Sequence, residues 1–425
     1  MASTTASLEI HVKGRWHVAG ALSFSAPERG ISSPGAFEYD LDYLDTMSTA
    51  LGVRDARAVS CGYPLAYDTP TEAAWPPFLL DIIPTGAARR YWEDRLQLPN
   101  TSSSDWQVLM HGAGNPTGNL RIREAVDSPN PGTHPGFSRA DVLERAEHFI
   151  EYAHASGAPV SGSSGAGGDS PKFLLREDKK GRWFADGVLP DSKTRHCWLV
   201  KFPRTRDASD RLILEAEAAY HAVAKRLGVR TFGDVTWESD CLFIPRFDRV
   251  VRKGVIERLG LESLCSLVGI AEFGVPLRKE RQVSALMRYV TEPQQELREF
   301  LLRDVLDVAM GNTDNHGRNT SVLKTADGFI ALSPLYDFAP MILDRRGVAR
   351  VSRWEDNADY PNWTGVAEAV ARFADVGQTK RWLRHLGARI EELPNTMKDV
   401  GVPVRVIARC EERIRRVASG LRTVR

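Results

Sequence analysis

An aspartate, an asparagine and a second aspartate are spaced in this chain as phosphoryl-transfer chemistry requires. Asp314 is followed five residues later by Asn319, within the stretch GNTDNHGRN. Two short apolar runs, 321–323 and 329–332, then flank an Asp-Gly turn, which is typical of a β-hairpin. A hairpin returns the chain to its starting point, so we expect Asp337 to lie close to Asp314 and Asn319.

Phosphoryl transfer from ATP depends mainly on positioning and on the neutralisation of charge. The spacing from Asp314 to Asn319 is that of a protein-kinase catalytic loop, in which the Asp receives the substrate hydroxyl proton and the Asn holds Mg²⁺. Asp337 stands where a kinase has its second Mg²⁺-binding Asp, and carboxylate and amide oxygens are hard ligands suited to this ion. The alternative is a polar surface loop with an Asp-Gly turn, because Asp-x-x-x-x-Asn also occurs by chance.

A lysine and a glutamate earlier in the chain would complete such a site. Lys201 ends an apolar strand, as the strand lysine of a kinase does. Residues 210–227 predict a strong helix that stops at Gly228 and contains Glu215 and Glu217. A kinase pairs its strand lysine with a glutamate on the next helix, and Glu217 is our candidate. In the alternative interpretation, the lysine is a solvated edge residue and the glutamate lies at the surface.

Two further segments have the composition of nucleotide-binding elements. Residues 160–172 are rich in Gly and Ser and lead into a strand, so backbone N–H groups near Gly167 and Gly168 could fold over phosphate. This segment is not a Walker loop, and its composition also suits a flexible linker. Residues 241–250 predict an apolar strand with a charged exit. In an ATP-binding lobe that strand would be the hinge, and otherwise it is an ordinary core strand.

The predicted elements divide the chain into a strand-rich part and a helical part. Alternating apolar residues in 8–12 and 16–22 predict a strand–turn–strand unit, and Ser138 is a plausible N-cap for a helix over 138–156. Beyond residue 250 helical spacing dominates, in 261–273, 282–289, 297–310, 366–373, 380–393 and 404–421. We predict an α+β, two-lobed fold with an all-helical C-terminal part apart from the hairpin. The expected subdomains are 1–137, 138–252 and 253–425.

Composition excludes several classes of protein. The 425 residues, 42% hydrophobic and 26% charged, are enough for two or three globular domains. A net charge of +1 gives no sign of a strongly basic nucleic-acid-binding face. No apolar run reaches the length of a transmembrane helix, and five dispersed cysteines indicate neither a zinc site nor a disulfide framework. We therefore expect a cytoplasmic protein without membrane contact.

The order of these pieces resembles the HipA family of bacterial toxin kinases over nearly the full length of the chain. The most specific pieces are 312–321 and the Leu-Tyr-Asp at 335–337. None of the earlier pieces is specific by itself, and they support the resemblance through their order along the chain. They lie at 20–24, 37–40, 79–84, 170–173, 200–203, 224–228, 246–249 and 264–265.

The resemblance implies an ATP- and Mg²⁺-dependent serine/threonine protein kinase that acts as the toxin of a type II toxin–antitoxin system. By this resemblance, Lys201 would bind the ATP phosphates and pair with Glu217. Asp314 would be the catalytic base. Asn319 and Asp337 would hold Mg²⁺.

The resemblance also assigns residues around the nucleotide. Pro245 and Phe247 would line the adenine end. His316 follows Asp314 by two residues, where ordinary kinases have a lysine, so Arg318 could supply the missing cation. Ala339 replaces the Gly of the kinase Asp-Phe-Gly, so an in/out flip of that segment should not be assumed.

Regulation and partners are likewise implied by the family. Members regulate themselves by autophosphorylation of a serine in the Gly-rich loop, for which Ser163 and Ser164 are our candidates. They pair with a small helix-turn-helix antitoxin, so we expect contact with DNA only through that partner. Their protein substrates are translation factors or aminoacyl-tRNA synthetases.

Two other functions use the same residues. The fold could serve as a catalytically weak nucleotide-binding switch, or as a DNA-bound partner of a helix-turn-helix repressor. A metal-dependent nuclease or hydrolase would employ the same acidic groups with water as the nucleophile. Phosphate transfer, or tight ATP binding without it, separates these possibilities.

Overall fold

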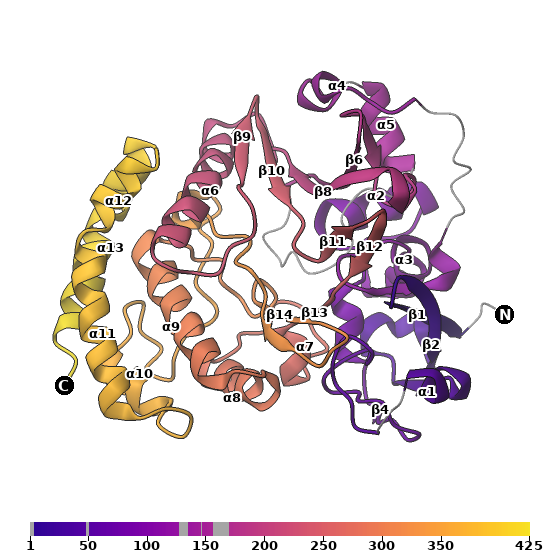
Figure 1. The fold of residues 1–425 in the computed structure, drawn as a ribbon, viewed down its shortest axis with the longest axis horizontal. Helices are drawn as coiled ribbons and strands as arrows, with labels where there is room; N and C mark the ends of the chain where they lie inside the picture. Colours follow the sequence, from indigo (N-terminus) through magenta and orange to yellow (C-terminus); the bar gives the residue numbers. More distant parts are fainter. Residues whose placement is uncertain (1–3, 48–50, 127–134, 146, 156–169) are drawn as a thin grey trace.

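The computed structural model of the 425-residue chain describes residues 4–47, 51–126, 135–145, 147–155 and 170–425. Its elements form three successive groups, shown from indigo to yellow in Figure 1. An N-terminal sheet with short helices lies at the right, a second sheet at the top centre, and the last helices at the outer left edge. The fold is α+β and two-lobed, as predicted from the sequence.

The N-terminal sheet has the strand order β4-β3-β2-β1-β5. β1 pairs antiparallel with β2, which confirms the predicted strand–turn–strand unit. Leu8, Ile10 and Leu22 are completely buried under this sheet because alternate residues of a strand share one face. The strands are β1 (Thr5–Val12), β2 (Arg15–Phe24), β3 (Gly35–Tyr39), β4 (Thr71–Glu72) and β5 (Leu120–Ile122), and the helices are α1 (Leu41–Met47), α2 (Gly86–Leu96) and α3 (Asp105–Gly112).

The second sheet has the order β7-β6-β8-β10-β9. Its strands are β6 (Lys172–Asp178), β7 (Trp183–Ala185), β8 (Thr194–Lys201), β9 (Thr236–Glu238) and β10 (Cys241–Pro245). β8 is the central strand and pairs antiparallel with both β6 and β10. The chain then enters α6 (Ala208–Arg226), whose first turn is capped by Asp207 accepting from the N–H of Ser209.

The predicted helix over 138–156 is two helices, α4 (Arg139–Leu143) and α5 (Glu147–Ala155). Ser138 is the N-cap as predicted and forms a reciprocal capping box with Asp141. Arg145 has φ of 51°, in the left-handed region that no α-helix contains, so the first helix cannot continue through it.

The hairpin predicted after Asn319 is present as β14 (Ser321–Lys324) and β15 (Ile330–Leu332). It extends a three-stranded sheet by pairing with β13 (Gly260–Ser263). The predicted helix over 261–273 is therefore wrong in its first turn, because Leu261 lies opposite Leu323 in a strand pair. Only α7 (Leu264–Val268) of that segment is helical. A separate hairpin, β11 (Arg249–Arg252) with β12 (Val255–Arg258), precedes this sheet.

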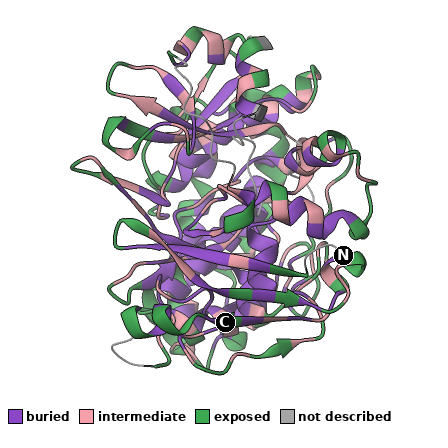
Figure 2. Cartoon of the chain, turned by 90° about the vertical axis from the view of Figure 1, so that its right-hand side faces the viewer, coloured by how far each residue is buried: buried purple, intermediate pink, exposed green. Residues whose placement is uncertain are grey.

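The last third of the chain is dominated by helices around α9. α9 (Pro293–Met310) is buried along most of its length and packs against α8 (Lys279–Tyr289) and α13 (Val404–Arg422). The outer helices are α10 (Trp363–Ala369), α11 (Val376–Glu391) and α12 (Leu393–Asp399). Figure 2 shows buried residues concentrated in the strands and inner helices, with exposed residues at the turns. Among the described residues, no helix combines the length and apolar character needed to cross a bilayer.

Candidate active site

Lys201 is held at the end of the central strand of the second sheet. Strands on both sides cover it, and only 4% of its surface is exposed. Its Nζ lies 2.6 Å from Glu217 Oε1 and also contacts Asp337 Oδ1. Burial disfavours the charged form, but Asp337 and Glu217 outweigh that cost and raise the pKa of Lys201. The lysine is therefore a fixed positive charge between two carboxylates.

The helical period of α6 selects which of its glutamates reaches the lysine. Ile213, Leu214, Glu217 and Tyr220 are buried on the face of α6 that is turned into the protein. Glu215 is exposed to solvent. The structure therefore brings together Lys201 and the glutamate that the sequence reasoning chose, Glu217.

The loop that holds Asp314 closes on itself through Asn319. Asn319 donates its Nδ2 to the backbone carbonyl of Asp314 at 2.8 Å. This contact turns the amide so that its Oδ1, which is buried, has no hydrogen-bond partner in the described part of the chain. The following hairpin then brings Asp337 back to the same place. Asp337 has φ of 50°, a left-handed conformation that non-glycine residues rarely adopt and that recurs at functional sites.

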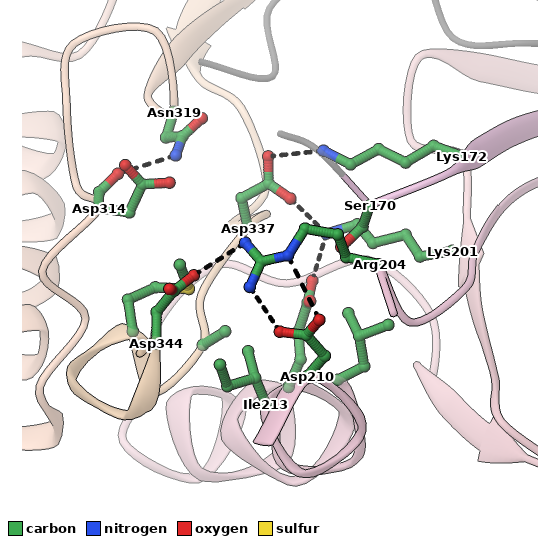
Figure 3. Close-up of a pocket in the computed structure, with 14 residues that line it drawn as sticks. Ser170, Lys172, Lys201, Arg204, Asp210, Ile213, Asp314, Asn319, Asp337 and Asp344 are labelled. Carbon is green, nitrogen blue, oxygen red and sulfur yellow. Dashed lines mark hydrogen bonds and ion pairs between the residues drawn. The ribbon is translucent and has the colours of Figure 1, made fainter. Parts of the chain in front are cut away.

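These residues line one open pocket between the second sheet, α6 and the segment that follows the hairpin. In Figure 3, Lys172 and Lys201 reach toward Asp337 from one side, and Asp314 and Asn319 lie on the other. Arg204 closes the lower edge by pairing with Asp210 at 2.6 Å and Asp344 at 3.2 Å. Segments from three distant parts of the sequence thus meet in one cavity.

Asp314 and Asp337 have opposite electrostatic environments in the pocket. Burial, followed by repulsion from Asp337, raises the pKa of Asp314 to about 7. Burial acts in the same sense on Asp337, but Lys172 and Lys201 outweigh it and hold the pKa of Asp337 well below its usual range. Neighbouring carboxyl groups whose pKa values are driven apart can divide acid–base work and charge binding between them.

The donor set fits a Mg²⁺ ion that is bound together with a nucleotide. Asn319 Oδ1 is a buried oxygen without a partner, and the Asp337 carboxylate is ionised. Within the described residues, no group of three or more His, Cys, Asp or Glu side chains forms a dedicated metal site. Mg²⁺ is usually held by one or two protein oxygens plus substrate phosphates, so Asn319 and Asp337 suffice.

The pocket contains a second lysine that the sequence reasoning did not select. Lys172 Nζ lies 3.8 Å from Asp337 Oδ2, and Lys172 is directly opposite Lys201 in the sheet. Burial lowers its pKa, and the positive charge of Lys201 acts in the same sense. The sequence signal was a lysine at the start of the strand that follows the Gly/Ser segment, but its relevance depends on the register of β6 with β8.

Arg318 does not supply a cation to this pocket, contrary to our expectation. Its guanidinium lies 3.0 Å from Asp81 Oδ1 and donates to the carbonyls of Ile270 and Glu272. Arg318 is buried, and a buried guanidinium needs a carboxylate, which the N-terminal subdomain provides. The arginine thus joins the catalytic-loop segment to a distant part of the fold.

His316 is neutral and lies beside Asp314. Its Nε2 is 3.7 Å from Asp314 Oδ1, and its Nδ1 accepts from the backbone N–H of Arg318 at 3.2 Å. Burial lowers the pKa of His316 to about 4. The imidazole therefore braces the loop without placing a positive charge there.

Pro245 and Phe247, which were also selected from the sequence, are not part of this pocket lining. Pro245 ends β10, and the ring of Phe247 packs against Tyr336 with 5.9 Å between ring centroids. Their assignment to the adenine end stays a prediction. Gly167, Gly168, Ser163 and Ser164 lie outside the described residues.

A comparison with protein-family models matches residues 164–399 to the HipA-like C-terminal domain, which is more than half of the chain. The chain belongs to the HipA family. A search of curated proteins found no significant match. Among solved structures, HipA of Shewanella oneidensis MR-1, determined as a complex with HipB and its operator DNA, matches with a TM-score of 0.67 and 18% identity. That match covers 99% of this chain and 100% of the Shewanella chain.

A more distant structural match is CtkA, a proinflammatory kinase of Helicobacter pylori, with a TM-score of 0.33 and 12% identity. It covers 54% of this chain and 87% of CtkA, and so low a similarity supports no functional argument. The Shewanella HipA match, at its low identity, establishes the fold rather than the activity. The pocket residues of this HipA-family chain must carry the functional argument.

Proposed function

We propose that this HipA-family chain is an ATP- and Mg²⁺-dependent serine/threonine protein kinase and the toxin of a type II toxin–antitoxin system. The observation that carries the proposal is the contact of Lys201 with both Glu217 and Asp337 in the pocket that Asp314 and Asn319 also line. A strand lysine fixed by a helix glutamate, facing an Asp/Asn/Asp set, is the arrangement that phosphoryl transfer from ATP uses.

In this proposal each residue has a separate task. Lys201 binds the ATP phosphates while Glu217 keeps its ammonium in place. Asp314, with a pKa of about 7, receives the proton of the attacking hydroxyl near neutral pH. Asn319 and Asp337 present oxygens to Mg²⁺, which when bound neutralises phosphate charge. Lys172 supplies the additional positive charge that an ordinary kinase takes from its catalytic loop.

The partners follow from the family and remain part of the proposal. The Shewanella HipA structure contains HipB and operator DNA. By analogy, this chain would bind a small helix-turn-helix antitoxin and would reach DNA through it. Its substrate would be a serine or threonine of a translation factor or aminoacyl-tRNA synthetase, with self-modification at Ser163 or Ser164.

The test is phosphate transfer from ATP and Mg²⁺ by the purified chain, mapped by mass spectrometry. We expect phosphate on a serine of the Gly/Ser segment or on a protein of a cell lysate. Asp314→Asn should reduce the rate by about two to four powers of ten, because positioning and proton acceptance are lost together. Asp327→Asn, in the exposed hairpin turn, is the matched control. ATP binding without transfer would instead favour a nucleotide-dependent switch.

A further inference from the structure

Asp307 is a buried carboxylate at the end of α9, outside the pocket. Its backbone carbonyl accepts from the N–H groups of both Gly311 and Asn312, where the helix stops and the catalytic loop begins. Gly311 has φ of 70°, and a Cβ there would lie 2.7 Å from the side chain of Ile342. The chain therefore leaves the helix along a path with little freedom, directly toward Asp314.

The side chain of Asp307 holds that loop on both sides of Asp314. Asn312 Nδ2 donates to Asp307 Oδ1 at 2.8 Å, and Asn315 Nδ2 donates to Asp307 Oδ2 at 2.9 Å. Both asparagines are buried. Their Oδ1 atoms, and the hydroxyl of Thr313 between them, have no hydrogen-bond partner among the described residues. The carboxylate is therefore a side-chain anchor for residues 312–315 of this loop.

A carboxylate at this position is costly for the fold. No lysine or arginine of the described chain forms an ion pair with Asp307, although Asp304, one turn earlier, pairs with Lys279 at 3.1 Å and Arg350 at 2.6 Å. Burial raises the pKa of Asp307 to about 6. An ionised Asp accepts hydrogen bonds with both oxygens and donates none, so it sets the orientation of both asparagine amides. A neutral amide could not accept from both in the same way.

We propose that Asp307 is a positioning residue for phosphoryl transfer, acting on Asp314 through the amides of Asn312 and Asn315. This inference rests on the proposed kinase function. A displacement of the catalytic carboxylate by about 1 Å can cost roughly a hundredfold in rate. The groups assigned to ATP binding, Lys201 and Glu217, belong to other elements and do not contact Asp307.

The test combines transfer kinetics with hydrogen exchange in the full-length chain, using labelled ATP and the chain's own phosphorylation. Asp307→Ala should lower the rate at saturating ATP by about 10- to 100-fold. The ATP concentration that gives half the maximal rate should stay within about twofold of the wild-type value. Asp307→Asn, which keeps the volume, should retain more activity than the alanine variant. Amide exchange over 312–316 should accelerate in the alanine variant. Arg298→Ala, at an exposed position of the same helix, should leave that exchange unchanged.

A double-mutant cycle with Asn315→Ala gives a readout that general destabilisation would not produce. If Asp307 acts through Asn315, the double variant should transfer phosphate no more than about twofold more slowly than Asp307→Ala alone. Fully multiplicative effects would overturn the inference, as would a wild-type rate in a folded Asp307→Ala protein. Absence of phosphate transfer by the wild-type chain would overturn the proposed function itself. Faster amide exchange over 312–316 in Asp307→Ala would then show only that Asp307 anchors the loop structurally.

Discussion

The ammonium of Lys201 lies 2.6 Å from the Glu217 carboxylate and at the same time contacts Asp337, so one lysine joins α6 to the segment that follows the hairpin. The three groups come from a central strand, a helix and a loop that are separated by up to 136 residues in sequence. Because Lys201 and Glu217 are buried and Asp337 is partly buried, their charges interact strongly. The position of each is therefore set by the other two.

Glu217→Gln should weaken ATP use far more than Glu215→Gln. The first change leaves Lys201 with Asp337 as its acidic partner and removes the group that orients its ammonium from α6. We expect kcat/KM for ATP to fall by about 10- to 100-fold, as for the loss of a charge-assisted contact. Glu215 is exposed and serves as the matched control. Equal effects of the two substitutions would contradict this role for Glu217.

Lys172→Met should reduce phosphate transfer while preserving the fold. The methionine keeps the buried stem of the lysine but removes the ammonium near Asp337. We expect the rate at saturating ATP to drop by about tenfold or more, because preorganised charge acts on the transition state. Lys180→Met, at an exposed turn, is the control. An active Lys172→Met enzyme would show that the charge of Lys172 is not used.

Arg318→Leu should impair folding rather than phosphate binding. It leaves Asp81 buried without its cation, which typically costs about 3–5 kcal/mol. Urea denaturation would measure the free energy of unfolding. The double variant Asp81→Leu/Arg318→Leu should recover part of the loss, because it removes both charges. A stable Arg318→Leu protein with weakened ATP binding would instead restore the phosphate role that we first expected for this arginine.

The ionised form of Asp307 should make the protein less stable as the pH rises toward 6. Its pKa is raised to about 6 in the folded chain, above the value of about 3.9 in an unfolded one. Between about pH 4 and 6 the folded state therefore binds a proton that the unfolded state has lost. The contribution of Asp307 to the free energy of unfolding is therefore fully present below about pH 4. It is lost as the pH rises from about 4 to 6. We expect the Tm of Asp307→Asn, measured relative to the wild-type Tm at the same pH, to increase from pH 4.5 to pH 7.5.

Local sequence patterns were sufficient to predict the parts of the site whose residues lie close together in the chain. Asp314, Asn319 and the hairpin before Asp337 were predicted from spacing and an Asp-Gly turn, and the structure places Asp314, Asn319 and Asp337 in one pocket. Glu217 was predicted from the kinase pairing of a strand lysine with a helix glutamate, and the structure shows why it fits better than Glu215. Glu217 lies on the buried face of α6, whereas Glu215 is exposed. Local spacing failed at 261–273, where pairing of Leu261 with Leu323 overrode the helical pattern.

The sequence by itself determined the chemical groups of this HipA-family protein, their order and the local elements that carry them. Only the tertiary structure decided which charges meet. It turned Arg318 to Asp81, placed Lys172 beside Lys201 through the register of β6 and β8, and set the asparagines around Asp314 onto Asp307. The physical reason is that a buried charge or amide must find a partner, and that partner is supplied by whichever distant segment the fold brings within reach.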